Sequence, residues 1–110
     1  MSDDWPIEMS VSEYDALRRE GRSHCLLDVR EPAEVAASRI EGSLHIPMRS
    51  LPERLAELPD DQPIVVMCHL GGRSLQVVQW LRTQGRDQTT SLAGGIAAWA
   101  QEIDPSVGAA

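Results

Sequence analysis

The feature that most constrains this chain is the stretch 64–74, where an apolar run, a short loop with two glycines and a helical pattern follow one another. The apolar run at 64–67 is mostly β-branched, which predicts a buried strand. Cys68 stands at the end of that strand. After the loop, apolar residues recur at helical spacing to about residue 84. The stretch therefore predicts a strand, a tight loop and a helix, with a cysteine at the turn.

This geometry favours a reactive thiolate at Cys68. A loop that leads into a helix directs backbone N–H groups into one small space, and the start of the helix adds positive potential. A thiol held there should ionise below the pKa of about 8.5 of a free cysteine. Arg73 supplies a fixed positive charge at the far end of the loop. The alternative is that Cys68 only packs in the core, as cysteines often do, but packing requires neither the two glycines nor the arginine.

The composition is that of an ordinary globular protein, with 42% hydrophobic and 25% charged residues. We expect one domain over residues 1–110, with frayed ends at 1–6 and 105–110. No apolar run approaches the roughly 20 residues that cross a bilayer. The first residues are acidic and contain no apolar signal core, so we expect a cytoplasmic location.

The net charge of −7 argues against nucleic acid and anionic membranes as partners, because both require a basic face. It does not exclude a small anionic substrate, which responds to the local field of one loop. The cysteines and histidines lack the ligand spacing of a zinc site, so no metal and no other cofactor is expected. Cys25 lies within an apolar run and is assigned to the core.

Strands and helices alternate along the chain. We expect strands at 7–9, 25–29, 44–46, 64–67 and 89–92. We expect helices at 11–20 after a capping box at Ser10, from Pro32 onward, at 51–58 capped by Ser50, up to 84 after the loop, and around 96–99. The alternation predicts an α/β fold in three layers, a central parallel sheet of about five strands with helices on both faces. Ligands of such sheets bind at the carboxyl ends of the strands, where Asp28, Cys68 and Gly94 all fall.

Several motifs, in this order, give the chain a family resemblance. They are Leu27-Asp28-Val29-Arg30-Glu31, Ile40-Glu41-Gly42-Ser43-Leu44-His45-Ile46-Pro47, Cys68-His69-Leu70-Gly71-Gly72-Arg73-Ser74 and Leu92-Ala93-Gly94-Gly95-Ile96-Ala97-Ala98-Trp99. Together they span most of the chain, which resembles a single-domain rhodanese of the thiosulfate sulfurtransferase type. One departure is Arg39, which stands where the family usually has a histidine, and we expect it to change the surface or packing rather than the chemistry.

The resemblance implies a transferase that moves a sulfane sulfur through a persulfide on Cys68. The donor would be thiosulfate or another persulfide, and the acceptor a thiol, or cyanide in the test tube. The loop would bind the substrate through His69, Leu70, Gly71, Gly72, Arg73 and Ser74. In this reading the backbone amides from His69 to Arg73 cradle the persulfide anion, and the Arg73 side chain helps to hold its charge. The implied partners are a small anionic sulfur donor and a thiol acceptor, or a protein that donates a persulfide or accepts the sulfur.

Two other functions are considered. Related phosphatases and arsenate reductases carry one more residue between the cysteine and the arginine, so the shorter Cys68-to-Arg73 loop favours sulfur transfer. Rhodanese-like folds that lack the cysteine serve as non-catalytic partner-binding domains, and here the cysteine is present.

Three further residues carry open alternatives. Asp28 and Arg30 lie at the same end of the sheet and are candidates for orienting the loop. The structural alternative, which we favour, has Asp28 capping a turn and Arg30 paired with Glu31 or Glu34. His69 is a candidate proton acceptor, but we favour a lining role for it.

Overall fold

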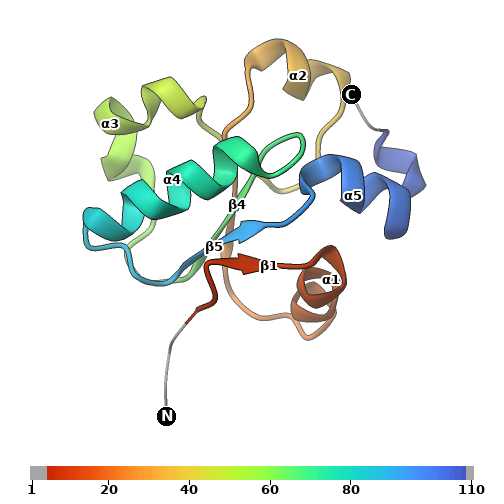
Figure 1. Ribbon diagram of the computed structural model, residues 1–110, viewed down its shortest axis with the longest axis horizontal. Coiled ribbons are helices and arrows are strands. Elements are labelled where there is room, and N and C mark those ends of the chain that lie inside the picture. Colours follow the sequence, from red (N-terminus) through yellow and green to blue (C-terminus); the bar gives the residue numbers. More distant parts are fainter. Residues whose placement is uncertain (1–4, 109–110) are drawn as a thin grey trace.

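The computed structural model describes residues 5–108 and contains a five-stranded sheet at its centre (Figure 1). Its strands are β1 Glu8–Met9, β2 Cys25–Asp28, β3 Leu44–His45, β4 Ile64–Met67 and β5 Thr89–Leu92. They lie in the order β1-β5-β4-β2-β3, and every neighbouring pair is parallel. The predicted α/β fold with about five parallel strands is confirmed. β4, which precedes the cysteine loop, lies in the middle of the sheet.

Helices connect the strands in sequence. They are α1 Val11–Arg19, α2 Pro32–Ala37, α3 Leu51–Arg54, α4 Gly72–Thr83 and α5 Gly95–Glu102, with 3₁₀ turns η1 Met48–Ser50, η2 Leu55–Glu57 and η3 Pro105–Val107. Helix α1 begins with the predicted capping box. The Glu13 N–H donates to Ser10 Oγ at 3.1 Å, and the Glu13 carboxylate accepts from the Ser10 N–H at 2.9 Å. These two bonds satisfy backbone N–H groups that the first turn of a helix leaves without partners.

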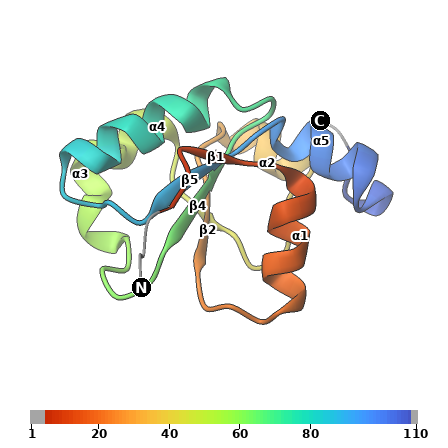
Figure 2. The same ribbon diagram turned by 60° about the horizontal axis from the view of Figure 1, so that its bottom comes forward.

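Two apolar clusters lie on opposite faces of the sheet. Figure 2 shows the helices that cover these faces, α1 and α5 on one side and α3 and α4 on the other. One cluster joins α1 and α5 to the sheet through Val11, Tyr14, Leu17, Ile96 and Trp99. The other joins α3 and α4 to the opposite face through Leu51, Val77, Val78 and Leu81. Successive residues of a strand point to opposite faces, so Val65 and Val66 of β4 belong to different clusters. The helices thus cover both faces of the sheet, as expected.

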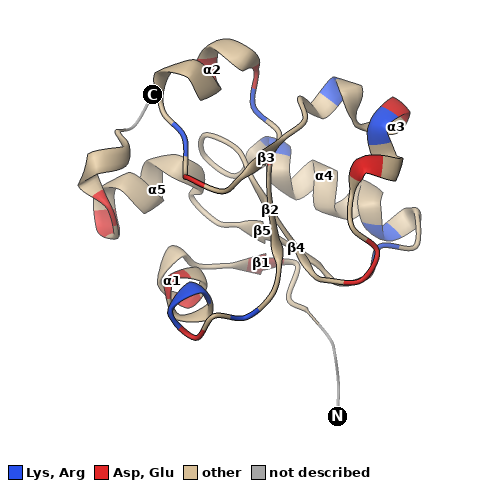
Figure 3. Cartoon of the chain, turned by 180° about the vertical axis from the view of Figure 1, so that it is seen from behind, with Lys and Arg blue, Asp and Glu red and all other residues tan. Residues whose placement is uncertain are grey.

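Charged residues lie mainly on the outer helices and the loops. In Figure 3, blue and red positions lie side by side along α1 and from α3 into η2; Arg19 pairs with Asp15 in α1, and Arg54 at the end of α3 pairs with Glu57 of η2. Exposed ion pairs of this kind contribute little to stability, because water screens the attraction between the charges. The stability of the fold therefore rests mainly on the two apolar clusters.

The structure differs from the sequence-based expectations in two segments. The helix expected at 51–58 is a four-residue helix α3 followed by the turn η2. Ser50 does not cap it, because Ser50 belongs to η1 and already has helical backbone angles (φ −90°, ψ −10°). The tail expected to be frayed from residue 105 instead forms η3, and Val107 packs against the core; residues 1–4 and 109–110 lie outside the described part.

Two remaining features of the described chain concern its surface. Arg39 is exposed and donates to the Ser43 carbonyl at 3.3 Å, which agrees with the expected surface role. Within residues 5–108, none of the helices has the length and apolar character needed to span a membrane.

Candidate functional site

The sheet register brings the predicted site residues to one edge. Asp28 at the end of β2 lies opposite Met67 at the end of β4. The chain then turns into the loop 68–74, which leads into α4. β5, which pairs with β4, ends at the same edge, and the chain continues from there into α5. The carboxyl edge of the sheet therefore collects the cysteine loop, the Asp28 segment and the beginning of α5.

The first turn of α5 holds the backbone of the loop from one side. The Ile96 N–H donates to the Cys68 carbonyl at 2.9 Å, and the Ala97 N–H donates to the His69 carbonyl at 3.1 Å. This contact requires a glycine at position 95, where φ is +62° and a Cβ would lie 2.3 Å from the His69 carbonyl oxygen. The glycine pair of the closing motif thus lets α5 approach the loop closely.

The loop wraps polar hydrogens around the Cys68 sulfur. The N–H groups of Gly71 and Ser74 donate to Cys68 Sγ at 3.0 and 3.3 Å, and the Ser74 hydroxyl lies 3.4 Å from the sulfur. Gly71 has φ +109°, a conformation that a glycine adopts without strain. The cradle was expected from the amides of His69 to Arg73; the amides that donate to the sulfur are that of Gly71 and, outside that range, that of Ser74.

The environment of Cys68 acts on the pKa of its thiol in two directions. Burial raises the pKa, because it disfavours the charged form. Hydrogen bonds from the Ser74 hydroxyl and from the amides of Ser74, Gly71 and Arg73 lower it, and the net result is a pKa below the ordinary value. Cys25 has only burial acting on it, which raises its pKa. Both thiols are free, and Cys68 is the one poised as a nucleophile.

A buried hydroxyl pair supports the Ser74 side chain. Ser74 Oγ lies 2.7 Å from Ser91 Oγ and also contacts the Gly71 carbonyl at 3.1 Å. Both serines are fully buried. Ser91 was not singled out from the sequence. The feature that could have pointed to it is a polar residue near the end of an expected strand, and in the structure all four residues of β5 are buried.

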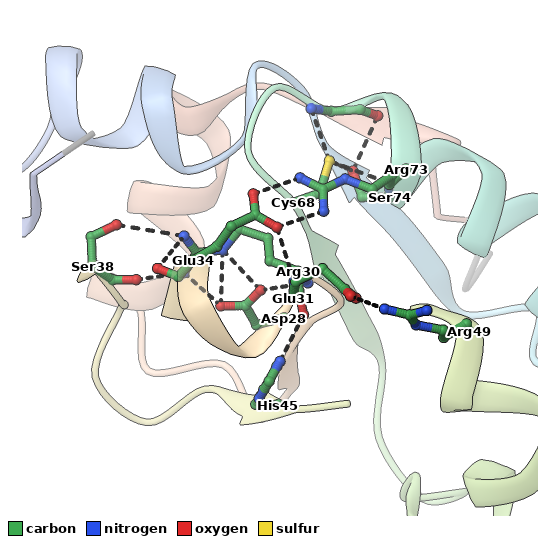
Figure 4. A network of polar contacts seen from close by, with 11 residues as sticks. Asp28, Arg30, Glu31, Glu34, Ser38, His45, Arg49, Cys68, Arg73 and Ser74 are labelled. Carbon is green, nitrogen blue, oxygen red and sulfur yellow. Dashed lines mark hydrogen bonds and ion pairs between the residues drawn. The ribbon is translucent and has the colours of Figure 1, made fainter. Parts of the chain in front are cut away.

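The Arg73 side chain is bound to a carboxylate of the neighbouring helix (Figure 4). Its two terminal nitrogens donate to the two oxygens of Glu34 in α2, at 2.8 and 2.9 Å. The Arg73 guanidinium is the main cause that lowers the pKa of Glu34 to about 2. Glu34 also accepts the Glu31 N–H at 2.9 Å, so it fixes the start of α2 as well. From the sequence, Glu34 was expected only as a candidate partner of Arg30, so its pairing with Arg73 was not predicted.

Asp28 and Arg30 form a buried ion pair beneath the loop. Arg30 donates to the Asp28 carboxylate from its side chain at 2.8 Å and from its backbone at 3.0 Å, and both side chains have 0% exposure. Arg30 also donates to the Ser38 carbonyl at 2.6 Å, and its own carbonyl contacts His45 at 2.7 Å. The expected ion pair of Arg30 with Glu31 or Glu34 is wrong. The chain turns between Asp28 and Arg30, so that the Arg30 guanidinium lies against the Asp28 carboxylate. The pair ties the end of β2 to the segment after α2.

Two loop side chains, those of Leu70 and His69, take no part in the sulfur contacts described above. Leu70 is 66% exposed, one of the most exposed large apolar residues described. His69 is half-buried, and its Nδ1 has no hydrogen-bond partner in the described structure. Their backbones, rather than these side chains, shape the described part of the site.

The assembled site can stabilise a thiolate. Amides and a hydroxyl converge on one sulfur atom, which is the arrangement an anionic sulfur requires. Over residues 5–108 there is no group of three His, Cys, Asp or Glu side chains placed to hold a metal ion.

The chain is similar to known proteins in both sequence and structure. Residues 10–102 match the Rhodanese-like domain family. A sulfurtransferase of Allochromatium vinosum is 42% identical over 82 residues, which cover 74% of this chain and 77% of that protein. The human single-domain sulfurtransferase TSTD1 superposes with a TM-score of 0.77 at 29% identity, covering 89% of this chain and 98% of that one. The chain also matches part of a longer maize protein, adenylyltransferase and sulfurtransferase MOCS3-2, with 35% identity over 88% of this chain but only 22% of that protein.

Proposed function

Because the chain belongs to the family of rhodanese-like domains, we propose that it is a sulfurtransferase in which Cys68 carries the sulfur as a persulfide. The observation that carries this proposal is the set of hydrogen bonds to Cys68 Sγ from Gly71 and Ser74. The sulfurtransferase relatives support the class of reaction, and the geometry of the site supports Cys68 as the residue that performs it.

In the first step, the Cys68 thiolate attacks the outer sulfur of a donor, either thiosulfate or a persulfide. A bond forms between the two sulfurs, and the bond between the outer sulfur and the rest of the donor breaks. The electron pair of that bond leaves with sulfite or with a thiolate. The loop amides that stabilise the thiolate then stabilise the new terminal sulfur, which carries the negative charge.

In the second step, an acceptor thiolate or cyanide attacks the terminal sulfur of the persulfide. The bond between the two sulfurs breaks, and Cys68 returns as a thiolate in the same cradle. The low pKa of Cys68 makes it a good leaving group in this step as well as an ionised nucleophile in the first. One residue and one loop thus serve both halves of the reaction.

The acceptor in the cell is a thiol in this proposal. In the maize relative, the matching sequence is one part of a longer protein whose name includes sulfurtransferase. This supports a protein as the donor or acceptor of the sulfur.

The test compares sulfur transfer by the wild type, Cys68→Ala and Cys25→Ala, with thiosulfate or glutathione persulfide as donor and cyanide as acceptor. We expect thiocyanate to form with the wild type and Cys25→Ala, and no enzymatic thiocyanate with Cys68→Ala. Equal activity of Cys68→Ala and the wild type would overturn the proposal. A wild type that is folded but inactive with both donors would favour a partner-binding domain instead.

A further inference from the structure

Each arginine in the network beside the sulfur already has a carboxylate partner within the chain (Figure 4). Three ion pairs join one arginine to one carboxylate each: Arg73–Glu34, Arg30–Asp28 and Arg49–Glu31. The Arg73–Glu34 pair is bidentate, with both terminal nitrogens of the guanidinium engaged. These pairs leave no uncompensated cation among the charged side chains of this network, and the whole chain carries a net charge of −7.

The groups that do contact the sulfur are neutral. They are the amides of Gly71 and Ser74 and the Ser74 hydroxyl, at 3.0–3.4 Å from Cys68 Sγ. Amides in this arrangement stabilise an anionic sulfur through their dipoles, but they bring no net positive charge. Cys68 is only 1% exposed, so a donor must approach a buried sulfur.

These properties discriminate between the two classes of sulfur donor. Thiosulfate is a dianion whose outer sulfur is bonded directly to a bulky sulfonate, and it must approach a thiolate. A hydropersulfide is neutral when protonated and a monoanion when ionised, and its outer sulfur is bonded to a slim, two-coordinate sulfur. Repulsion between like charges is strong near a buried group, where water screens poorly. Both charge and shape therefore favour the persulfide.

We propose, on the basis of the sulfurtransferase function above, that Cys68 takes its sulfur from a persulfide rather than from thiosulfate. The Cys68 thiolate attacks the outer sulfur of R–S–SH, and the bond between the two donor sulfurs breaks. The electron pair leaves with R–S⁻, which takes up the proton released when the Cys68 hydropersulfide ionises. The products are R–SH and the Cys68 persulfide anion, so no oxidant or reductant is consumed. The carrier R is either a small thiol or the cysteine of a protein.

Glu34 is the residue that sets this preference, because it neutralises Arg73. Replacing Glu34 by glutamine removes one negative charge and leaves the Arg73 guanidinium uncompensated beside the loop. Glutamine still accepts the Glu31 N–H, so the capping of α2 is retained. Glu41→Gln is the matched control. It causes the same change in net charge at an exposed residue before β3, at the opposite end of that strand from the site.

The experiment measures the second-order rate constant for loading sulfur onto Cys68 by mass spectrometry. The donors are thiosulfate, glutathione persulfide and a persulfidated cysteine desulfurase, which distinguish the small from the protein carrier. For the wild type we expect the better persulfide donor to react at least about tenfold faster than thiosulfate, which corresponds to about 1.4 kcal/mol. Glu34→Gln should raise the thiosulfate-to-persulfide ratio several-fold, and Glu41→Gln should leave it unchanged.

The outcomes separate this inference from the function on which it rests. If thiosulfate loads wild-type Cys68 as fast as the persulfides, the inference is wrong and the sulfurtransferase function stands. If Glu34→Gln changes both rates in proportion, Glu34 does not set the preference. If no donor places sulfur on Cys68, the proposed function itself fails.

Discussion

At the scale of single residues, the reactivity of Cys68 depends on a balance between burial and hydrogen bonding. Burial alone raises the pKa of a thiol, as it does at Cys25. At Cys68 the hydrogen bonds of the loop outweigh burial, so the pKa of the thiol lies below its ordinary value and the thiolate is favoured relative to a free cysteine. Ser74 is central to this balance, because both its backbone N–H and its hydroxyl contact the sulfur.

Ser74→Ala tests that balance. The variant removes the hydroxyl that lies 3.4 Å from the sulfur and leaves the buried Ser91 hydroxyl without its partner at 2.7 Å. We expect the pKa of Cys68 to rise and the free energy of unfolding to fall by about 1–3 kcal/mol. The pKa is measured from the pH dependence of iodoacetamide alkylation in a Cys25→Ser background. Ser12→Ala, at an exposed position of α1, is the control, and an unchanged alkylation midpoint in Ser74→Ala would contradict the assignment.

At the scale of elements, the loop 68–74 is held by α2 and α5, two helices that follow strands other than β4. The first turn of α5 binds the carbonyls of Cys68 and His69, and Glu34 of α2 binds the Arg73 side chain. The loop is therefore held from both sides by segments distant in the sequence. Its geometry depends on the packing of these helices as well as on its own residues.

Gly95→Ala tests the contact between α5 and the loop. A Cβ at this position would lie 2.3 Å from the His69 carbonyl oxygen and 2.5 Å from that of Cys68, so the helix or the loop must move. We expect a loss of several kcal/mol in the free energy of unfolding, together with loss of sulfur transfer. Gly85→Ala is the matched control: Gly85 also has a positive φ, +86°, but nothing lies within 4 Å of its Cβ position.

Urea denaturation compares the two glycine variants. Gly85→Ala reports the backbone strain alone, which we expect to cost about 1–3 kcal/mol. The excess loss in Gly95→Ala measures the close approach of α5. Equal losses in the two variants would show that this approach is not important for stability.

The Glu34–Arg73 pair predicts a pH dependence of stability in the acid range. The pKa of Glu34 is lowered to about 2 in the folded protein, whereas an ordinary glutamate titrates near 4.5. The pair therefore stabilises the fold fully above about pH 4.5 and loses its contribution as the pH falls towards 2. Because both side chains are about one-third exposed, we expect the contribution to be no more than about 1 kcal/mol.

This dependence is measured as the difference in urea stability between the wild type and Glu34→Gln. The difference should be constant from pH 7 to pH 5 and should shrink between about pH 4.5 and 2. Glu41→Gln, at an exposed position, serves again as the control. A difference that stays constant down to pH 2 would show that Glu34 titrates elsewhere.

At the scale of the whole molecule, the sheet separates two apolar clusters, which we expect to contribute independently to stability. Val11 lies in the cluster under α1 and α5, and Val77 lies in the cluster under α4. Both side chains are 3% exposed. Replacing either by alanine removes buried methyl groups and should cost about 2 kcal/mol.

The double variant Val11→Ala/Val77→Ala should lose the sum of the two single losses, within about 0.5 kcal/mol, because the sites lie on opposite faces of the sheet. Urea denaturation of the wild type, both single variants and the double variant provides the four values. A larger coupling energy would show that the two faces of the sheet do not respond separately.

Much of this architecture was predictable from the sequence. The alternation of apolar strands with capped amphipathic helices predicts the parallel sheet, and the position of Cys68 at a strand end predicts the edge where the site lies. Such local patterns depend only on residues that are close together in the sequence. The capping box at Ser10 and the glycine-containing loop were found for that reason.

The partners of charged side chains were not predictable in the same way. Arg73 binds Glu34, which is 39 residues away, and Arg30 forms its ion pair with the Asp28 carboxylate rather than with the carboxylates of the glutamates that follow it. These choices depend on how helix α2 packs beside the loop, which no local pattern specifies. The hydroxyl pair of Ser74 and Ser91 likewise arises only when β5 lies next to β4.

The central claim is that Cys68 carries a persulfide, and mass spectrometry tests it most directly. The protein is incubated anaerobically with glutathione persulfide, its intact mass is measured, and the modified peptide is identified before and after addition of a thiol. The account predicts a gain of one sulfur, about 32 Da, on Cys68, which the thiol removes, and no such gain in Cys68→Ala. A folded wild-type protein that gains no sulfur, or that gains it on Cys25 instead, would contradict the account.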